Sequence, residues 1–180
     1  ALRGADIVLL CLPGYAIKSQ VLKIKPFVNE HTYVGTVFSS TGFFFEAMEL
    51  FEGNVPLWGF QRVPFIARTN VYGESAHLLG YKNSHNIAVE RSNDKEGFRK
   101  RIEELFDAPV HLLNNYYEAS FTNSNPILHP SRLYTLFKDW NEDVYYDHQF
   151  LFYEEWTDEA SELLIALDKE LFSVLAKLPV

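Results

Sequence analysis

The segment from Asn123 to Pro130 combines side chains that could bind a substrate and move a proton. Asn125 offers an amide that donates and accepts hydrogen bonds, and His129 has an imidazole that titrates near neutral pH. Pro130 suits the first position of a helix, where its missing N–H costs nothing. We therefore predict that His129 lies at a helix N-terminus, where the helix dipole favours the neutral, proton-accepting imidazole. The alternative is a histidine that only caps a break between helices.

Two predicted strand ends supply further candidates. Hydroxyls and a glycine follow one strand in Ser39-Ser40-Thr41-Gly42, and Leu12-Pro13 ends another. Ligands of open α/β sheets bind beyond the carboxyl ends of the strands, so both turns are candidate binding loops. Turns of this composition also occur with no ligand. Arg68 follows the apolar stretch Val63–Ala67, and its planar guanidinium could hold a carboxylate; a plain surface arginine is the alternative.

The sequence lacks the motifs of several other sites. The remaining histidines have no metal-ligand spacing to one another, and neither H-E-x-x-H nor C-x-x-C occurs. Ser39, Ser40 and Ser120 lack the setting of a nucleophile elbow. There is also no G-x-G-x-x-G and no P-loop. If the fold binds a dinucleotide, the strand that carries its glycine fingerprint is expected upstream of Ala1.

The elements that would position these residues alternate between strand and helix up to about residue 107. Continuous apolar runs predict buried strands, and apolar residues spaced by three and four predict helices. The predicted strands cover residues 5–12, 32–38, 56–69 and 86–90, and the predicted helices cover 17–28, 44–51 and 97–106. This order is typical of βαβ units and a largely parallel sheet.

Beyond Pro109 the pattern changes, and we predict helices and no strand. One helix is expected over Leu113–Phe121, another from His129-Pro130 onward, and a last one that begins after the capping residue Thr157. The last helix carries an apolar stripe of Ala160, Leu163, Leu164, Leu167, Leu171, Val174, Leu175 and Leu178. We expect the stripe to pack within a helical domain and partly against another chain, as in a homodimer, or against a portion outside this sequence.

Composition and charge restrict the class of protein. The chain has 180 residues, of which 47% are hydrophobic and 22% charged, and this suits a globular protein with a substantial core. The formal net charge of -8 argues against nucleic acids and anionic membranes as partners. Cys11 lies in an apolar run that is too short to span a bilayer, and we expect a buried thiol. The default location is the cytoplasm.

Three segments together resemble the octopine/nopaline (opine) dehydrogenase family. In chain order they are Ser40-Thr41-Gly42-Phe43, Arg62-Val63-Pro64-Phe65-Ile66-Ala67-Arg68 and Asn125-Pro126-Ile127-Leu128-His129-Pro130. The segment Phe152-Tyr153-Glu154-Glu155-Trp156-Thr157, followed by Ala166-Leu167-Asp168-Lys169-Glu170, resembles the family's helical domain. The resemblance covers most of the chain, and the Asn-Pro-x-x-His-Pro motif is its most specific part.

The resemblance implies a two-part architecture. Residues 1–107 would be the C-terminal portion of an α/β Rossmann NAD(P)-binding domain, incomplete here because its first strands are lacking. Residues 108–180 would be the N-terminal portion of an all-α substrate and dimerisation domain of the 6-phosphogluconate dehydrogenase C-terminal-like type. The glycine fingerprint and the region that would supply an acidic partner for His129 are both missing. We therefore expect a piece of a longer enzyme that is inactive alone.

The resemblance also implies an activity. The family couples an amino acid to a 2-oxo acid through an imine that NADH or NADPH reduces, so the enzyme would be an oxidoreductase acting on CH–NH groups. His129 would be its acid/base residue. Substrates would contact Asn125, Arg68, Thr41 and Gly42, and the nicotinamide would be flanked by Leu12, Pro13, Ser39 and Ser40. The alternatives are a ketopantoate reductase-like dehydrogenase, for which a lysine base is expected, and a non-catalytic interaction domain that kept the fold.

Overall fold

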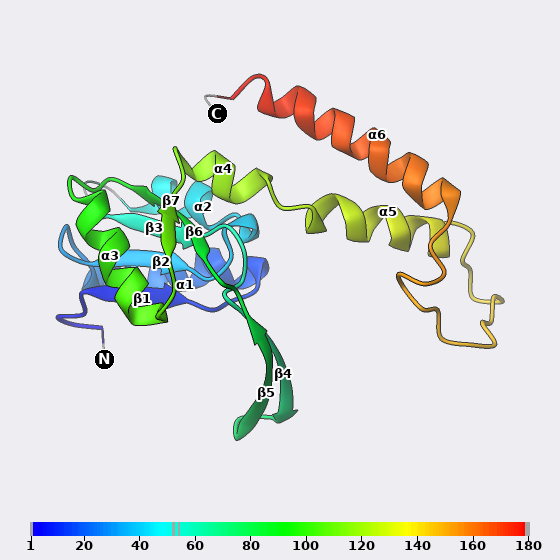
Figure 1. Cartoon of the computed structure of the whole chain (residues 1–180), viewed down its shortest axis with the longest axis horizontal. Coiled ribbons are helices and arrows are strands. Elements are labelled where there is room, and N and C mark those ends of the chain that lie inside the picture. Colours follow the sequence, from blue (N-terminus) through cyan, green and yellow to red (C-terminus); the bar gives the residue numbers. More distant parts are fainter. Residues whose placement is uncertain (1, 52, 54, 179–180) are drawn as a thin grey trace. The chain divides into compact units, whose positions relative to one another are not determined.

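A computed structural model describes residues 2–51, 53 and 55–178, and they form two compact units (Figure 1). The first unit extends to Asn123, and the second begins at Ser124. Each unit has its own secondary structure and packing, described in turn below.

The first unit is built on a five-stranded sheet in the order β1-β2-β3-β6-β7. β1 (Ile7–Leu10), β2 (Tyr33–Thr36) and β3 (Leu57–Phe60) run parallel to one another. β6 (His85–Glu90) is antiparallel to β3 and parallel to β7 (Val110–Leu112). The predicted sheet, largely parallel, is confirmed.

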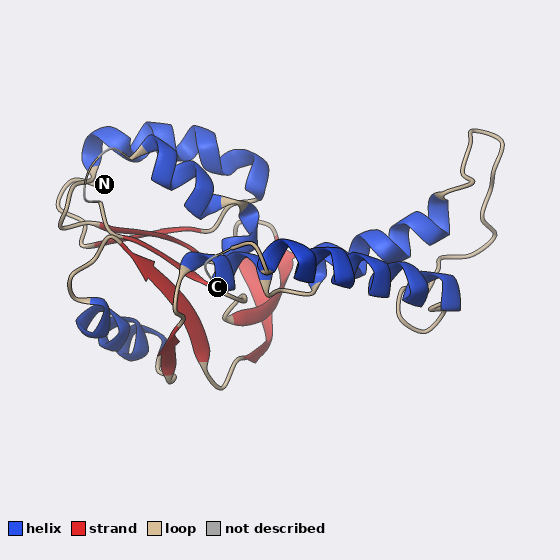
Figure 2. Ribbon diagram, turned by 90° about the horizontal axis from the view of Figure 1, so that it is seen from above, coloured by secondary structure: helices blue, strands red, loops and turns tan. Residues whose placement is uncertain are grey.

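Helices cover both faces of this sheet (Figure 2). α1 (Gly14–Ile24) and α2 (Phe43–Leu50) bury their apolar faces in one core, and the short turn η1 (Lys25–Phe27) follows α1. α3 (Lys95–Phe106) packs on the other face with a second core. The burial of apolar side chains on both faces explains the continuous apolar runs of the strands.

The stretch predicted to be extended over residues 56–69 is divided between two sheets. β3 ends at Phe60, and β4 (Phe65–Val71) leaves the main sheet to pair with β5 (Ser75–Tyr81) in an antiparallel hairpin. The hairpin projects from the main sheet, and nearly all of its residues are exposed (Figure 1). The sequence pattern did not predict β5.

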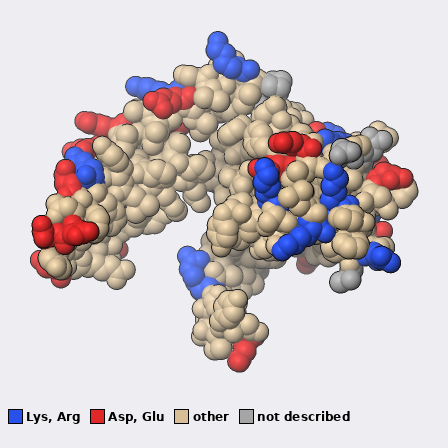
Figure 3. Space-filling model, turned by 180° about the vertical axis from the view of Figure 1, so that it is seen from behind, with Lys and Arg blue, Asp and Glu red and all other residues tan. Residues whose placement is uncertain are grey.

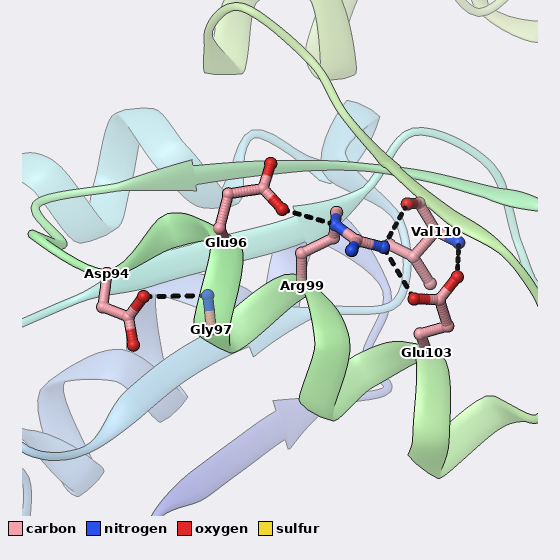
Figure 4. Close-up of polar contacts among 6 residues, drawn as sticks. All are labelled: Asp94, Glu96, Gly97, Arg99, Glu103 and Val110. Carbon is pink, nitrogen blue, oxygen red and sulfur yellow. Dashed lines mark hydrogen bonds and ion pairs between the residues drawn. The ribbon is translucent and has the colours of Figure 1, made fainter.

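The prediction of no strand beyond Pro109 is wrong, because Val110–Leu112 forms β7. Its three residues are too few to show a strand pattern, and tertiary contacts with α3 hold them in place (Figure 4). The Arg99 guanidinium donates 3.1 Å to the Val110 carbonyl, and the Val110 N–H donates 3.3 Å to the Glu103 carboxylate. Arg99 also bonds Glu103 at 2.7 Å, so the two side chains clamp the strand from the helix.

In its described residues, the second unit contains two packed helices, α5 (Asn125–Phe137) and α6 (Asp158–Leu175). Every residue from Ser131 to Lys177 is described, and none lies in a strand, as predicted. The Thr157 hydroxyl caps α6 by accepting a hydrogen bond of 3.2 Å from Ala160 N, which confirms the predicted cap. Within the described chain, Ala160 is the one stripe residue that is buried, and Val174 remains 52% exposed.

The surface carries charges of both signs. Basic and acidic side chains are interspersed on the face shown in Figure 3, with wide uncharged areas between them. Over the residues that the structure describes, no helix combines the length and the apolar character that a bilayer span requires.

Candidate functional site

The carboxyl ends of β1, β2 and β3 meet at one edge of the main sheet because these strands are parallel. Val37 N donates a hydrogen bond of 3.1 Å to the Leu10 carbonyl, which ties the segment after β2 to the end of β1. A single 3-10 turn, η2 (Ser39–Thr41), then leads into α2. The two candidate turns therefore follow neighbouring strands at this edge.

These two turns touch through Gly14, the first residue of α1. A Cβ atom at Gly14 would lie 3.1 Å from the Thr41 carbonyl oxygen, a tight contact that a larger residue would relieve only by a small shift of one turn. Leu12 is partly buried against the core, and Pro13 has extended backbone before the helix. The structure thus brings the turn after β1, with Leu12 and Pro13, into contact with the turn after β2, which holds Ser39 and Ser40 for the cofactor and Thr41 and Gly42 for the substrate.

Ser39 and Ser40 hold the edge together by hydrogen bonds. The Ser39 hydroxyl is fully buried and donates 2.7 Å to the Phe60 carbonyl at the end of β3. The Ser40 hydroxyl is partly exposed and donates 2.9 Å to the Ser120 carbonyl in α4 (Tyr116–Phe121). Of the two side chains, only that of Ser40 is open to a ligand in this conformation.

Thr41 and Gly42 form the junction between η2 and α2. The Thr41 hydroxyl donates 2.8 Å to the Phe38 carbonyl, and Gly42 has a φ of 83°, in the left-handed region. A side chain at position 42 would be strained there, although no atom of the described residues lies within 4 Å of its Cβ position. The glycine is therefore explained by the turn itself.

Cys11 lies just beyond β1, and the prediction that its thiol is buried is wrong. The apolar run continues past the last strand residue, Leu10, so Cys11 emerges at the sheet edge with its side chain exposed. Partial desolvation raises the pKa of the thiol above its ordinary value, so it remains protonated at neutral pH.

A network of amides that the sequence analysis missed borders the same edge. Gln61 follows β3 directly; its Nε2 donates 2.6 Å to the Thr122 hydroxyl, and its Oε1 accepts 2.9 Å from Asn86 Nδ2. Nearby in α4, the Ser120 hydroxyl is buried and has no hydrogen-bond partner among the described residues. The signal that could have found Gln61 is its position at the carboxyl end of a buried strand.

Arg68 lies in the hairpin and not at the end of a main-sheet strand. Its side chain is exposed, and its guanidinium donates 2.9 Å to the carbonyl of its neighbour Ala67. The strand it occupies pairs only with β5 in the described part of the chain. The structure therefore does not gather Arg68 with the turns at the sheet edge.

In the second unit, the prediction that a helix begins at Pro130 is wrong. α5 begins at Asn125, Pro126 takes the early position in which a missing N–H is harmless, and Pro130 lies inside the helix. His129 is consequently one turn into α5 and not at its N-terminus. The dipole argument for a neutral imidazole, which depended on that position, no longer applies.

The imidazole of His129 is exposed and rests against Phe152. The two rings meet edge to face with centroids 5.3 Å apart. Asn125, the first residue of α5, is also exposed and lies one helical turn before His129. Residues four apart share a helix face, so both side chains lie on the same side of α5.

Arg132 supports this arrangement, and no pattern in the sequence singles it out. It is only 2% exposed, and its guanidinium donates 3.3 Å to the Phe152 carbonyl and 2.6 Å to the Glu155 carbonyl. Arg132 therefore fixes the segment that carries Phe152, the ring against which His129 packs.

His148 forms a separate charged group in the link between α5 and α6. Its Nδ1 lies 2.7 Å from Asp147 Oδ1, and its Nε2 lies 3.5 Å from Glu155 Oε1. The hydrogen bond to Asp147, followed by the charge of Glu155, raises the pKa of His148 above its ordinary value. Across the described ranges, no three His, Cys, Asp or Glu side chains are grouped to hold a metal ion.

The C-terminal part of the chain matches a known family. Residues 112–180 match the family described as "NAD/NADP octopine/nopaline dehydrogenase, alpha-helical domain". Relatives along the chain include "Uncharacterized protein y4xO" of Sinorhizobium fredii, 29% identical over 94% of this chain and 47% of its own length. The tauropine dehydrogenase of Arabella iricolor is 26% identical over 97% of this chain and 45% of its own.

The fold has counterparts among solved structures. Octopine dehydrogenase with NADH and L-arginine superimposes with a TM-score of 0.84 over 98% of this chain and 46% of that one, at 20% identity. D-mandelate dehydrogenase with NADH gives a TM-score of 0.63 over 95% and 53%, at 14% identity. These likenesses establish the fold: a Rossmann-like α/β part followed by a helical part.

This chain spans about half the length of the relatives that it matches. The opine dehydrogenase of Haliotis discus hannai, for example, is 22% identical over 95% of this chain but only 44% of its own length. The matched helical residues 112–180 include Asn125 and His129. Over these residues the chain is therefore similar to the α-helical domain of the NAD/NADP octopine/nopaline dehydrogenase family.

Proposed function

We propose that the protein carrying this chain is an NAD(P)-dependent, opine dehydrogenase-like oxidoreductase. It would condense an amino acid with a 2-oxo acid and reduce the resulting imine at the expense of NADH or NADPH. The observation that carries the proposal is the match of residues 112–180 to the family's α-helical domain, because this segment contains the Asn-Pro-x-x-His-Pro motif. Relatives named opine and tauropine dehydrogenases align along nearly the whole chain and support it.

The turns at the sheet edge fit the nicotinamide end of the cofactor. Leu12, Pro13, Ser39 and Ser40 carry no charge, and Gly14 allows the two turns to approach each other closely. Leu12 would offer an apolar surface to the nicotinamide ring, and the Ser40 hydroxyl would form a hydrogen bond with its carboxamide. Ser39 would hold the turn in place through its hydrogen bond to the Phe60 carbonyl. When bound, the reduced cofactor supplies a hydride to the imine carbon of the substrate.

His129 is proposed as the acid/base residue. The amine of the amino acid adds to the carbonyl carbon of the oxo acid, and the resulting carbinolamine loses its hydroxyl as water to give the imine. A protonated His129 would donate to that hydroxyl oxygen, and the neutral imidazole would take up a proton released by the amine. Its exposed ring, supported on one edge by Phe152, is accessible for both transfers.

Four residues are proposed to hold the substrates. The Asn125 amide would orient a substrate next to His129, since the two side chains share a face of α5. Thr41 and Gly42 would contribute at the sheet edge, and Arg68 would contact a carboxylate from the hairpin. All four roles follow from the resemblance to the family.

Turnover by the full-length protein tests the proposal. We expect oxidation of NADH or NADPH, followed by absorbance, only when a 2-oxo acid such as pyruvate and an amino acid are both present. A panel of amino acids then identifies the amine. Turnover with the oxo acid alone would indicate a hydroxy-acid dehydrogenase instead, and no turnover with any pair would favour a non-catalytic domain.

A further inference from the structure

A polar hollow of about 260 Å³ opens at the carboxyl edge of the sheet, where β3 ends and the antiparallel β6 begins. It is lined by Gln61, Arg62, Lys82, Ser84, His85 and Asn86. Drug-sized ligands occupy pockets of roughly 300–1,000 Å³, so this hollow suits a smaller molecule of a few heavy atoms.

Among the described residues that line it, the hollow has two cations and no carboxylate. Neither the Arg62 guanidinium nor the Lys82 ammonium has a hydrogen-bond or ion-pair partner among the described residues. Other basic side chains of the sheet unit, such as Lys18 and Arg99, are paired with glutamates. In a chain of net charge -8, two unpaired cations at one hollow create a local field that attracts an anion.

Hydrogen bonds and packing hold the polar side chains that line the hollow beside the two cations. Hydrogen bonds to Thr122 and Asn86 hold the Gln61 amide, and Gln61 N donates 2.9 Å to the Asn86 carbonyl. His85 is buried between the rings of Phe60 and Phe106, and desolvation lowers its pKa, so its ring is neutral at neutral pH. The wall thus presents amide, imidazole and hydroxyl groups that can donate hydrogen bonds without rearrangement.

A neighbouring hollow does not supply the missing counter-charge. Lys82 and His85 also border a space lined by Asp107, yet no ion pair forms between Lys82 and Asp107 within the described ranges. The Lys82 ammonium therefore stays available to a ligand on the side of Arg62.

We infer that Arg62 and Lys82 bind the carboxylate of a small 2-oxo acid in this hollow. The inference rests on the proposed function, which requires two carboxylate-bearing substrates and has so far given only Arg68 to hold one of them. A guanidinium fork binds both oxygens of a carboxylate, and an ammonium adds a second charge-assisted bond. The hollow lies at the same sheet edge as the proposed nicotinamide turns, because β3 is parallel to β1 and β2.

The test measures pyruvate binding to the full-length protein by calorimetry, with and without NADH and without any amine. We expect Arg62→Gln and Lys82→Gln each to weaken binding about tenfold or more, because each removes a hydrogen bond to a charged group. Arg62→Lys should retain part of the affinity. Lys100→Gln is the matched control: it removes an equally unpaired charge from the exposed face of α3 and should bind as the wild type does.

Three binding results would overturn the inference: no pyruvate binding by the wild type with or without NADH, equal binding by all variants, or binding of inorganic phosphate that pyruvate does not displace. The last outcome would assign the hollow to phosphate. The proposed function can fail on its own. If the full-length protein binds pyruvate through Arg62 but does not turn over, the proposed reaction is wrong and the carboxylate site stands. If Arg62→Gln turns over normally with an unchanged KM for pyruvate, the carboxylate site is wrong and the proposed reaction stands.

Discussion

His129 lies one turn into α5, with an exposed imidazole that packs edge to face against Phe152. The sequence identified this residue but misplaced its helix, since Pro126 and Pro130 are equally able to begin one. In the structure the helix begins before Pro126 and continues through Pro130, which leaves the Pro126 carbonyl without its helical hydrogen bond. Arg132 could not have been predicted, because its burial depends on a link some twenty residues away in the sequence, whose carbonyl groups it bonds.

Replacement of His129 tests the acid/base role. In the full-length enzyme we expect His129→Ala to lower kcat for the reductive condensation by at least about a hundredfold, the lower range for general acid–base catalysis. His129→Asn keeps a polar side chain but cannot transfer the proton, and should be nearly as slow. NAD(P) affinity should change little in either variant.

His31→Ala is the control for this series, because His31 is exposed and belongs to the other unit. It should leave kcat at the wild-type value. A kcat for His129→Ala within a few-fold of wild type would leave His129 with a packing role only.

The pH dependence of stability can be predicted from His148. Its pKa is raised in the folded state by Asp147 and Glu155, so its contribution is fully present below its ordinary value of 6.5 and is lost as the pH rises through the raised value. The Tm of the wild type should therefore exceed that of His148→Gln by more at about pH 5.5 than at about pH 8.5. The same Tm difference at both pH values would show that the ion pairs contribute nothing.

At the scale of elements, patterns of apolar residues predicted the three parallel strands and the helices α1, α2, α3 and α6. They failed where an element depends on distant contacts. β7 is held by Arg99 and Glu103, and β5 has hardly any buried residues from which a pattern could arise. The sheet edge was predicted from strand order, whereas the amide network of Gln61 depends on side-chain contacts with α4 and β6.

The link between α5 and α6 should depend on Arg132. Arg132→Met keeps a long apolar stem but leaves the Phe152 and Glu155 carbonyls without their donor, and we expect the free energy of unfolding to fall by about 1–3 kcal/mol. Chemical denaturation measures it. Lys169→Met, an exposed change on α6, should stay within about 0.5 kcal/mol of wild type; an equally small effect of Arg132→Met would mean that water replaces the guanidinium without loss.

At the scale of the whole molecule, the sequence of 180 residues contains the candidate nicotinamide turns but no glycine fingerprint for a pyrophosphate. The sequence pattern predicted a division after residue 107, whereas compact packing continues to Asn123 because β7 and α4 pack with the sheet. The roles of the stripe on α6 in assembly and of the two parts in catalysis remain predictions.

Cofactor binding should separate this chain from the full-length protein. We expect the 180-residue chain to bind NADH or NADPH weakly or not at all by calorimetry, and the full-length protein to bind one of them, because the pyrophosphate needs a helix N-terminus and glycine turn. Tight binding by the 180-residue chain would mean that the nucleotide site lies elsewhere.

The three tryptophans are distributed so that fluorescence can distinguish the two units. Trp58 is fully buried in the sheet unit between Phe60 and Phe98, whereas Trp140 and Trp156 belong to the helical unit. An indole in an apolar core emits at shorter wavelength than one in contact with water, and Trp140 is 56% exposed. With Trp140→Phe and Trp156→Phe combined, all tryptophan emission would come from Trp58. The unfolding of the sheet unit could then be followed without a contribution from the helical unit.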